Sequence, residues 1–331
     1  MNVVKTKLEF SDRLGGCKVR WGMGRMSYII SPGLYAVGSP SDKSPVFVTA
    51  NFKLSFDHLR SELTGINGWI LVLDTKGINV WCAAGKGTFG TDELVHRIRE
   101  TQLEKVISHR RLILPQLGAP GVAAHRVKEQ SGFRVIYGPI LAGDIPSFME
   151  NKLKATPQMR RVEFPLRQRA ALIPIELVMT FKYFLSAAII ILILSGFGPG
   201  IFAVDRMISY GSVNLLILLG LYTAGSVLPP LLLPWLPGRS FSAKGGFVGL
   251  VLALGLWWHF MQFPGLYRGW PGVTAWLLVI PAVISFLSMN FTGSSTYTSL
   301  SGVLKEMRRA MPVQICAAVV GLGFWIGGLF L

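Results

Sequence analysis

The chain has 331 residues, of which 51% are hydrophobic, and a formal net charge of +16 from 33 Lys and Arg against 17 Asp and Glu. This length is enough for two folding units, and the hydrophobic residues are unevenly divided, because nearly all of the region after Ile173 is apolar. Many of the basic residues flank hydrophobic segments, as in the cytoplasmic loops of membrane proteins, and no basic surface interleaved with aromatic residues stands out. The composition therefore predicts a domain outside the membrane joined to a membrane domain, and it argues against a nucleic-acid partner.

The three cysteines, Cys17, Cys82 and Cys316, lie far apart and form no Cys-x-x-Cys pair. This spacing argues against a disulfide framework, and against a zinc site or an iron–sulfur cluster held by this chain alone. Residues 1–16 mix polar and apolar types and lack the apolar core of a secretory signal, so we expect the first domain to stay in the cytoplasm.

In chain order, residues 1–40 are punctuated by glycines and give no clear pattern of elements, whereas the pattern from Val46 onward is regular. We predict strands at 46–49, 69–75, 78–81, 111–114 and 133–137, and helices at 55–63, 91–109 and 122–130, with Thr91 as a helix N-cap. Alternating strands and helices predict a parallel, Rossmann-like α/β sheet covered on both faces, in which ligands bind beyond the carboxyl ends of the strands.

A basic connector at 143–169 leads into apolar segments that are each long enough to cross a bilayer. We predict five membrane helices, at 175–197, 208–233, 247–263, 273–289 and 313–331, and hence a domain at 1–165 and an all-α transmembrane domain at 166–331. The loops alternate in charge: one side carries Arg239, Lys244, Lys305, Arg308 and Arg309, and the other carries Arg206 and Arg268. By the positive-inside rule we expect a multi-pass protein of the cytoplasmic (inner) membrane with its carboxyl terminus outside.

The membrane segments leave two matters open. The Gly323-x-x-x-Gly327 pattern is typical of a helix-packing face, either within one chain or in a dimer of the complex. The hydroxyl-rich segment 290–312 is either a basic loop at the lipid surface or a contact for the first domain.

The most distinctive stretch is 79–86, Asn-Val-Trp-Cys-Ala-Ala-Gly-Lys, which we interpret as a loop between a strand and a helix. A cysteine after a buried strand is usually a small core residue. Here the following Ala83, Ala84 and Gly85 would let a large flat ligand approach the backbone, and a helix N-terminus would lower the pKa of the Cys82 thiol. Cys17 and Cys316 have no such setting, so we interpret them as structural.

The same stretch formally matches a dinucleotide-binding fingerprint, Gly85-x-Gly87-x-x-Gly90. However, the basic run 109–111 stands where the acidic residue is expected. A Walker loop would need a glycine in place of Val80. Both nucleotide-binding interpretations are therefore weak.

The 79–86 motif, followed by Gly-Thr-Phe at 87–89, resembles the signature of the HgcA family, the membrane-anchored corrinoid proteins of microbial mercury methylation. Segments 49–57, 114–122 and 290–293 extend the resemblance over nearly the whole chain. It implies a cobalamin-type corrinoid whose cobalt takes the Cys82 thiolate as its lower axial ligand, and the Asp-x-His-x-x-Gly signature of histidine ligation is absent. The expected cofactor-binding residues are Thr49, Asn51, Thr75, Asn79, Val80, Trp81, Cys82, Ala83, Ala84, Gly85, Lys86, Gly87, Thr88, Phe89, Leu117, Gly118, Ala119, Pro120, Gly121, Val122 and Tyr137.

The resemblance also implies a corrinoid-dependent methyltransferase activity. The methyl group would pass with carbanion character to Hg(II), a ferredoxin-like iron–sulfur partner of the HgcB type would restore Co(I), and a methyltetrahydrofolate-linked system would donate the methyl group. The nearest alternative is a methyl carrier like the large subunit of the corrinoid iron–sulfur protein of acetyl-CoA synthesis, which acts on another acceptor. A membrane sensor or transporter with a nucleotide-binding domain is the alternative from another class.

Overall fold

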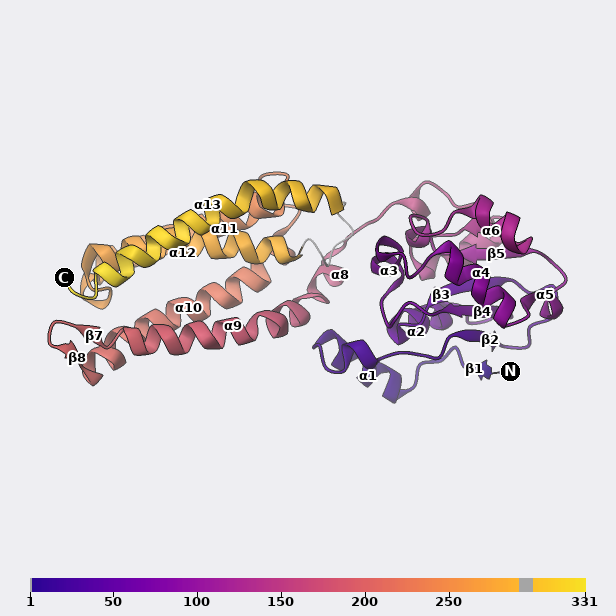
Figure 1. Ribbon diagram of the computed structural model, residues 1–331, viewed down its shortest axis with the longest axis horizontal. Coiled ribbons are helices and arrows are strands. Elements are labelled where there is room, and N and C mark those ends of the chain that lie inside the picture. The colour runs from indigo at the N-terminus through magenta and orange to yellow at the C-terminus, as the bar shows by residue number, and fades with distance from the viewer. Residues whose placement is uncertain (1, 292–299) are drawn as a thin grey trace. The chain divides into compact units, whose positions relative to one another are not determined.

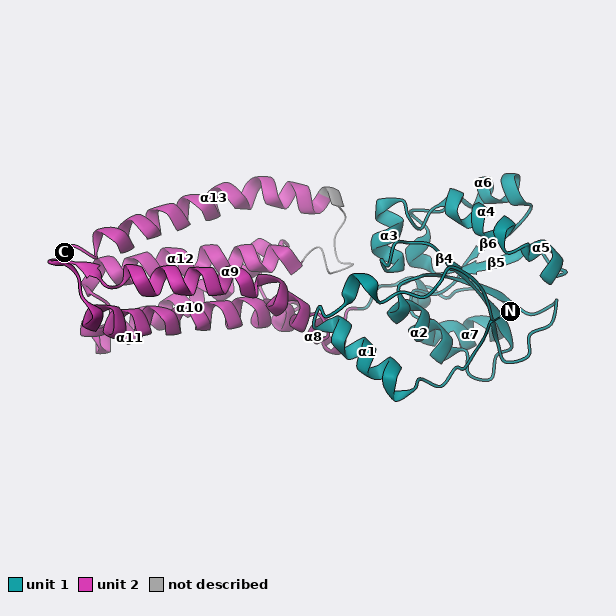
Figure 2. Ribbon diagram, turned by 60° about the horizontal axis from the view of Figure 1, so that its bottom comes forward, with its two compact units in different colours: residues 1–163 teal, residues 164–331 magenta. Residues whose placement is uncertain are grey.

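The computed structural model describes residues 2–291 and 300–331, and the chain forms two compact units that meet between Glu163 and Phe164 (Figures 1 and 2). The first unit is an α/β domain, and the second contains five long apolar helices. The predicted fold class, an α/β domain followed by an all-α domain of five apolar helices, is confirmed.

The first unit is built on a six-stranded sheet of order β1-β2-β4-β3-β5-β6. The strands are β1 (Asn2–Val4), β2 (Gly33–Val37), β3 (Val46–Ala50), β4 (Gly68–Leu73), β5 (Arg111–Leu114) and β6 (Arg134–Tyr137). Neighbouring strands are parallel except for β2, which runs antiparallel to β4. The expectation of a wholly parallel sheet is therefore wrong, because the short connection between β2 and β3 leaves no room for a crossover of a dozen or more residues.

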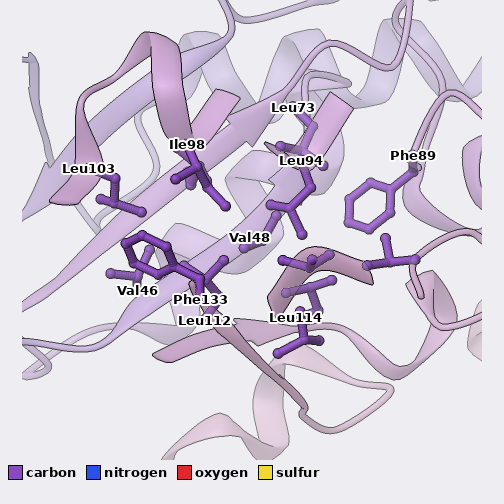
Figure 3. Close-up of a cluster of buried hydrophobic side chains, with 14 of the residues drawn as sticks. Val46, Val48, Leu73, Phe89, Leu94, Ile98, Leu103, Leu112, Leu114 and Phe133 are labelled. Atoms are coloured by element: carbon purple, nitrogen blue, oxygen red, sulfur yellow. The ribbon is translucent and has the colours of Figure 1, made fainter. Parts of the chain in front are cut away.

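Helices cover both faces of this sheet, and side chains alternate between two cores because successive strand residues point to opposite faces. One face carries α3 (Val80–Lys86), α4 (Thr91–Glu100), α5 (Leu103–Val106) and α6 (Ala124–Ser131); the other carries α2 (Lys53–Glu62) and α7 (Ile145–Glu150). Val46 and Val48 belong to the first core, whereas Phe47 between them belongs to the second. Figure 3 shows the first core, with Phe89 and residues of α4 beside the strands.

Two predicted elements of this domain are wrong. Residues 78–81 form no strand; they lead into α3, which begins at Val80. The reason is that β4 is already paired on both sides, with β2 and β3, so no neighbouring position is free for another strand after it. The expected helix 91–109 ends at Glu100 as α4, because Gln102 has a positive φ of 46°, and Gly90 rather than Thr91 is its N-cap.

Residues 1–40, which gave no pattern, contain β1, α1 (Phe10–Arg20), the 3₁₀ turn η1 (Arg25–Ser27) and β2. The basic connector is likewise partly ordered. It contains η3 (Ala142–Asp144), α7, η4 (Gln158–Arg160) and α8 (Leu166–Ala170).

The second unit consists of α8, α9 (Ile173–Leu194), α10 (Val204–Leu232), α11 (Phe241–Gln262), α12 (Gly269–Asn290) and α13 (Leu300–Gly327), with a two-stranded hairpin, β7 (Phe197–Gly198) and β8 (Ile201–Phe202), before α10. Five of its segments are long and apolar enough to cross a membrane. Lys305, Arg308 and Arg309, expected in a loop, lie in the first turns of α13 instead. Residues 292–299, which include much of the hydroxyl-rich segment and the end of the 290–293 motif, lie outside the described residues.

Glycines of α13 differ in their surroundings. A Cβ added at Gly321 would lie 3.0 Å from the carbonyl oxygen of Ala275 on α12, so this glycine permits close helix packing. A Cβ at Gly323 or Gly327 would meet no atom of the described residues within 4 Å. The Gly323-x-x-x-Gly327 face is therefore not used for packing within the described part of the unit.

Candidate functional site

The candidate site lies beyond the carboxyl ends of β3 and β4, where Asn51 follows one strand and residues 74–78 follow the other. The Asn51 side chain is buried, and its Oδ1 accepts hydrogen bonds from the backbone N–H groups of Thr75 (3.1 Å) and Gly77 (3.0 Å). The Thr75 hydroxyl lies 2.8 Å from the same Oδ1 and 2.7 Å from the carbonyl oxygen of Ile78. One side chain from β3 thus fixes the turn that leads from β4 to α3.

Asp74 is held from three directions. The Asn51 Nδ2 donates to its Oδ1, Lys76 forms an ion pair with its Oδ2, and its backbone N–H donates to Glu93 Oε1 at 2.8 Å. The hydrogen bond from Lys76 lowers the pKa of the Asp74 carboxyl. This carboxylate was not among the predicted site residues, although its place directly after a buried strand is a signal that sequence reasoning can use.

Cys82 lies in the first turn of α3, not in a loop as predicted. Asn79 is the N-cap, and its Oδ1 accepts the hydrogen bond of the Cys82 N–H at 2.9 Å. Gly87, with φ of 83°, ends the helix after seven residues. Because side chains three and four residues apart share a helix face, half-buried Cys82 lies on one face with exposed Gly85 and Lys86.

Ala83 and Ala84 face the opposite way. Their exposed fractions are 0% and 6%, and both belong to the core that contains Phe89. Their small side chains thus serve close packing of α3 on its own domain, and Gly85 is the small residue of this motif that is open to solvent.

The pKa of the Cys82 thiol is raised by burial, which outweighs the opposing effects of the Asn79 hydrogen bond and of the positive charges on Lys86 and Arg25. The expectation that a helix N-terminus lowers this pKa is therefore wrong, because the thiol is half buried and burial disfavours the thiolate. Arg25, from the region that gave no pattern, is a charged neighbour of the site that sequence reasoning missed.

The connection between β5 and α6 packs against α3 and Phe89. A Cβ at Gly118 would lie 2.6 Å from the Phe89 ring, and a Cβ at Gly121 would lie 2.1 Å from the Phe89 carbonyl oxygen and 3.0 Å from Ala84 Cα. Both positions need glycine for this close approach. The Tyr137 hydroxyl donates to the Val122 carbonyl oxygen at 2.6 Å and ties the connection to β6.

The structure thus gathers the predicted residues around α3 but gives them different surroundings. Those fully or partly accessible are Asn79, Val80, Trp81, Cys82, Gly85, Lys86, Gly87, Thr88, Leu117, Ala119, Pro120, Gly121 and Tyr137; those buried are Thr49, Asn51, Thr75, Ala83, Ala84, Phe89, Gly118 and Val122. Within the described residues, no three His, Cys, Asp or Glu side chains are placed to hold a metal ion together.

Fold and site together define an α/β domain with a thiol-bearing helix beyond the carboxyl ends of its central strands, joined in sequence to five long apolar helices. Residues 25–149, which include this site, match the family model described as CO dehydrogenase/acetyl-CoA synthase delta subunit.

Curated relatives are similar to about a third of the chain. The acetyl-CoA decarbonylase/synthase complex subunit gamma of Archaeoglobus fulgidus is 37% identical over 123 residues, which are 37% of this chain and 26% of that protein. The same subunit of Methanopyrus kandleri is 33% identical over 125 residues (37% of this chain, 27% of that protein). The corrinoid/iron-sulfur protein large subunit of Moorella thermoacetica is 30% identical over 122 residues (36% of this chain, 27% of that protein). The chain therefore spans about a quarter of the length of these relatives.

Proposed function

We propose that this chain is a membrane-anchored corrinoid protein that transfers a methyl group to Hg(II), in which the Cys82 thiolate would hold the cobalt of the corrinoid. The observation that carries the proposal is the position of Cys82. Its thiol lies on the accessible face of α3, beyond the carboxyl ends of the central strands, within the residues 25–149 that match the CO dehydrogenase/acetyl-CoA synthase delta subunit model. The signature at 79–89 directs the proposal to mercury methylation.

The residues present fit a large planar cofactor. A Cβ at Gly85 or Gly87 would meet no atom of the described residues within 4 Å, so the surface beside Cys82 is open to a bulky group. A thiolate is a soft ligand that suits a transition metal. Cys82 would hold the metal, while Gly85, Thr88, Leu117 and Ala119 would border the cofactor; when bound, the corrinoid supplies a cobalt-held methyl group for transfer.

The other residues of the site would position the Cys82 thiol and influence how readily it loses its proton. Asn51 and Asn79 fix the turn and the helix cap, so the direction of the Cys82 thiol is set before anything binds. A thiol must lose its proton at Sγ to become a metal ligand, and the positive charges of Lys86 and Arg25 favour the thiolate against the effect of burial. Seven buried residues would support the site from the interior of the domain: Thr49, Thr75, Ala83, Ala84, Phe89, Gly118 and Val122.

The substrate and partners follow from the chemistry. Hg(II) is a soft acceptor, and delivery of a methyl group with its bonding electron pair leaves a donor that needs two electrons before its next cycle. This chain has three cysteines that lie far apart in sequence, so we assign the electron supply to a ferredoxin-like iron–sulfur partner and the methyl supply to a methyltetrahydrofolate-linked system. The basic residues at 160–169, 239–244 and 305–309 would place the first domain in the cytoplasm and the carboxyl terminus outside.

A second candidate is a corrinoid methyl carrier for an acceptor other than mercury. The match of residues 25–149 to the acetyl-CoA synthase delta subunit model supports it, as do relatives that are subunits of acetyl-CoA decarbonylase/synthase complexes.

The test is expression of the full chain with its ferredoxin-like partner in an anaerobic, corrinoid-supplied host, with cobalt content and methylmercury both measured. We expect Cys82→Ala to abolish methylmercury, and Gly85→Leu to lower cobalt content by filling the open surface. Cys17→Ala, which removes an exposed thiol, is the matched control and should retain both.

Full activity in the Cys82→Ala protein would exclude the thiolate-ligand role. Cobalt in the wild type without methylmercury would favour the carrier for another acceptor.

A further inference from the structure

Helix α1 presents a narrow apolar stripe to its surroundings. Phe10, Leu14, Cys17 and Trp21 are spaced by four, three and four residues, which places them on one face of a helix. All four are exposed, with exposed fractions of 80% for Phe10 and 45% for Trp21. Apolar side chains in such a continuous row are unusual on a surface that faces only water.

The opposite face of α1 is fixed to its own domain. Val19 and Gly16 are buried, and a Cβ at Gly16 would lie 3.3 Å from Leu54 Cδ1. Asp12 forms ion pairs with Lys53 and Arg60 of α2, both at 2.6 Å. Because partly buried ion pairs and close packing hold this anchored face of α1 against α2, the stripe on the other face points outward and is exposed.

The apolar surface continues beyond α1 towards the candidate site. Met23, Met26 and Ile29 are exposed, with exposed fractions of 57%, 69% and 50%. A Cβ at Gly77 would lie 2.9 Å from Ile29 Cγ2 and 3.1 Å from the Met26 carbonyl oxygen, so this segment packs on the turn that leads to Cys82. The segment that follows α1 thus links the stripe to the turn before Cys82.

Basic residues border the stripe on both sides. On a helix, Lys18 lies to one side of the Phe10–Trp21 row, whereas Arg13 and Arg20 lie to the other. Arg13 and Lys18 are exposed, and the acidic residue in the helix, Asp12, points to the anchored face. A row of apolar and aromatic side chains with cations on both sides is the pattern of helices that lie in the plane of an anionic membrane surface.

We infer that α1, with Met23 and Met26, lies in the headgroup layer of an anionic bilayer and docks the first domain onto it. The first domain is joined in sequence to helices that are able to cross a bilayer, because Glu163 is followed directly by the unit that holds five of them. The flanking cations complement anionic headgroups, and Phe10, Leu14 and Trp21 suit the boundary between headgroups and acyl chains. This inference does not depend on the cofactor or on the acceptor of the methyl group.

The test uses the full chain with Cys82→Ala and Cys316→Ala, so that Cys17 in the stripe is the single thiol, labelled with an environment-sensitive fluorophore. The protein is reconstituted into vesicles of phosphatidylcholine and phosphatidylglycerol that contain a spin-labelled lipid quencher. The matched control carries the label at Gln130→Cys, with Cys17→Ala added. Gln130 is exposed on α6, which packs on β6 at the other edge of the sheet, and Figures 1 and 2 show α1 and α6 on opposite sides of the first unit.

We expect the lipid quencher to reduce the fluorescence of the Cys17 label several-fold more than that of the Gln130→Cys label. Phe10→Glu with Leu14→Glu should abolish the difference. Arg13→Glu with Lys18→Glu, which leaves the apolar row intact, should weaken it, as should vesicles without phosphatidylglycerol or high salt.

Equal quenching at the two positions in the otherwise unchanged protein would overturn the inference. So would a Cys17 label that lipid does not quench but that a ferredoxin-like protein shields when added, because the stripe would then be a protein-binding surface.

Discussion

The turn that carries Cys82 depends on a single side chain, and its removal gives a sharp test of how the site is built. Replacement of Asn51 by Ala would leave the backbone N–H groups of Thr75 and Gly77 without the Oδ1 acceptor that now lies 3.1 and 3.0 Å away. The Thr75 hydroxyl would keep the Ile78 carbonyl oxygen as its acceptor, at 2.7 Å. The change therefore creates two unsatisfied donors at buried residues.

The magnitude follows from these two donors. A buried donor left without a partner costs about 1–3 kcal/mol, and entry of a water into the space of the lost amide offsets part of this, so we expect about 2–4 kcal/mol for the pair. Because about 1.4 kcal/mol is a tenfold change in an equilibrium constant, the equilibrium constant for opening of the turn should rise about 30- to 700-fold.

The matched control is Thr75→Val, which keeps the volume of the side chain and leaves both N–H groups bonded to Asn51. It removes only the hydroxyl and should destabilise the turn by about 1 kcal/mol.

Hydrogen exchange of the full chain, followed by mass spectrometry, measures both effects locally. Peptides that cover 72–90 should lose protection in Asn51→Ala far more than in Thr75→Val, while peptides of α9–α13 should be unchanged. The reasoning would be refuted by a loss of less than threefold in Asn51→Ala, or by equal losses in the two variants.

Three further predictions concern packing and charge in the first unit. Gly121→Val should destabilise the domain by about 1–3 kcal/mol in thermal unfolding, because its Cβ would overlap the Phe89 carbonyl oxygen, whereas Gly85→Ala points into open space and should be neutral or stabilising by up to about 1 kcal/mol. Burial raises the pKa of the Cys82 thiol, so the protonated thiol favours the folded state. In cofactor-free protein, the rate at which Cys82 is alkylated should therefore rise with pH, with a midpoint above that of a small free thiol in the same buffers. For Asp12, burial opposes ionisation but the hydrogen bonds from Lys53, the Glu9 backbone and Arg60 outweigh it and lower the pKa to about 2. The stabilisation from this carboxylate is therefore complete above its ordinary pKa of 3.8 and is lost as the pH falls towards 2, so exchange protection of α1 should fall over this range in the wild type and not in Asp12→Asn.

The strands that carry the site were predictable because each is a short apolar run followed by polar residues. The runs at Val46–Ala50, Gly68–Leu73 and Arg111–Leu114 give buried strands within a residue or two of the predicted bounds. Their parallel order places Asn51 and Thr75 at one edge, as the alternation of strands and helices predicts. Periodicity thus located the edge of the sheet at which Cys82 lies.

The local structure around Cys82 was not predictable in the same way. Residues 78–81 are apolar and β-prone, but tertiary structure decides against a strand here. Strand β4 is already paired with β2 on one side and β3 on the other, and Asn79 caps a helix at this point. The raised pKa of the Cys82 thiol depends on how deeply the side chain is buried, which no spacing reveals. Likewise the antiparallel β2 and the inward ion pairs of Asp12 come from a region where glycines obscure any period.

The match to the family model covers one part of the chain. The matched residues, 25–149, hold the sheet from β2 onward and the whole surroundings of Cys82, whereas α1 and the five apolar helices all lie outside them. The contacts that join α1 to α2, the ion pairs of Asp12 and the close approach of Gly16 to Leu54, all lie on the face of α1 opposite the apolar stripe. We therefore infer that the apolar stripe of α1 acts together with the five helices that are able to cross a bilayer, and that both serve to hold the first domain at a membrane surface.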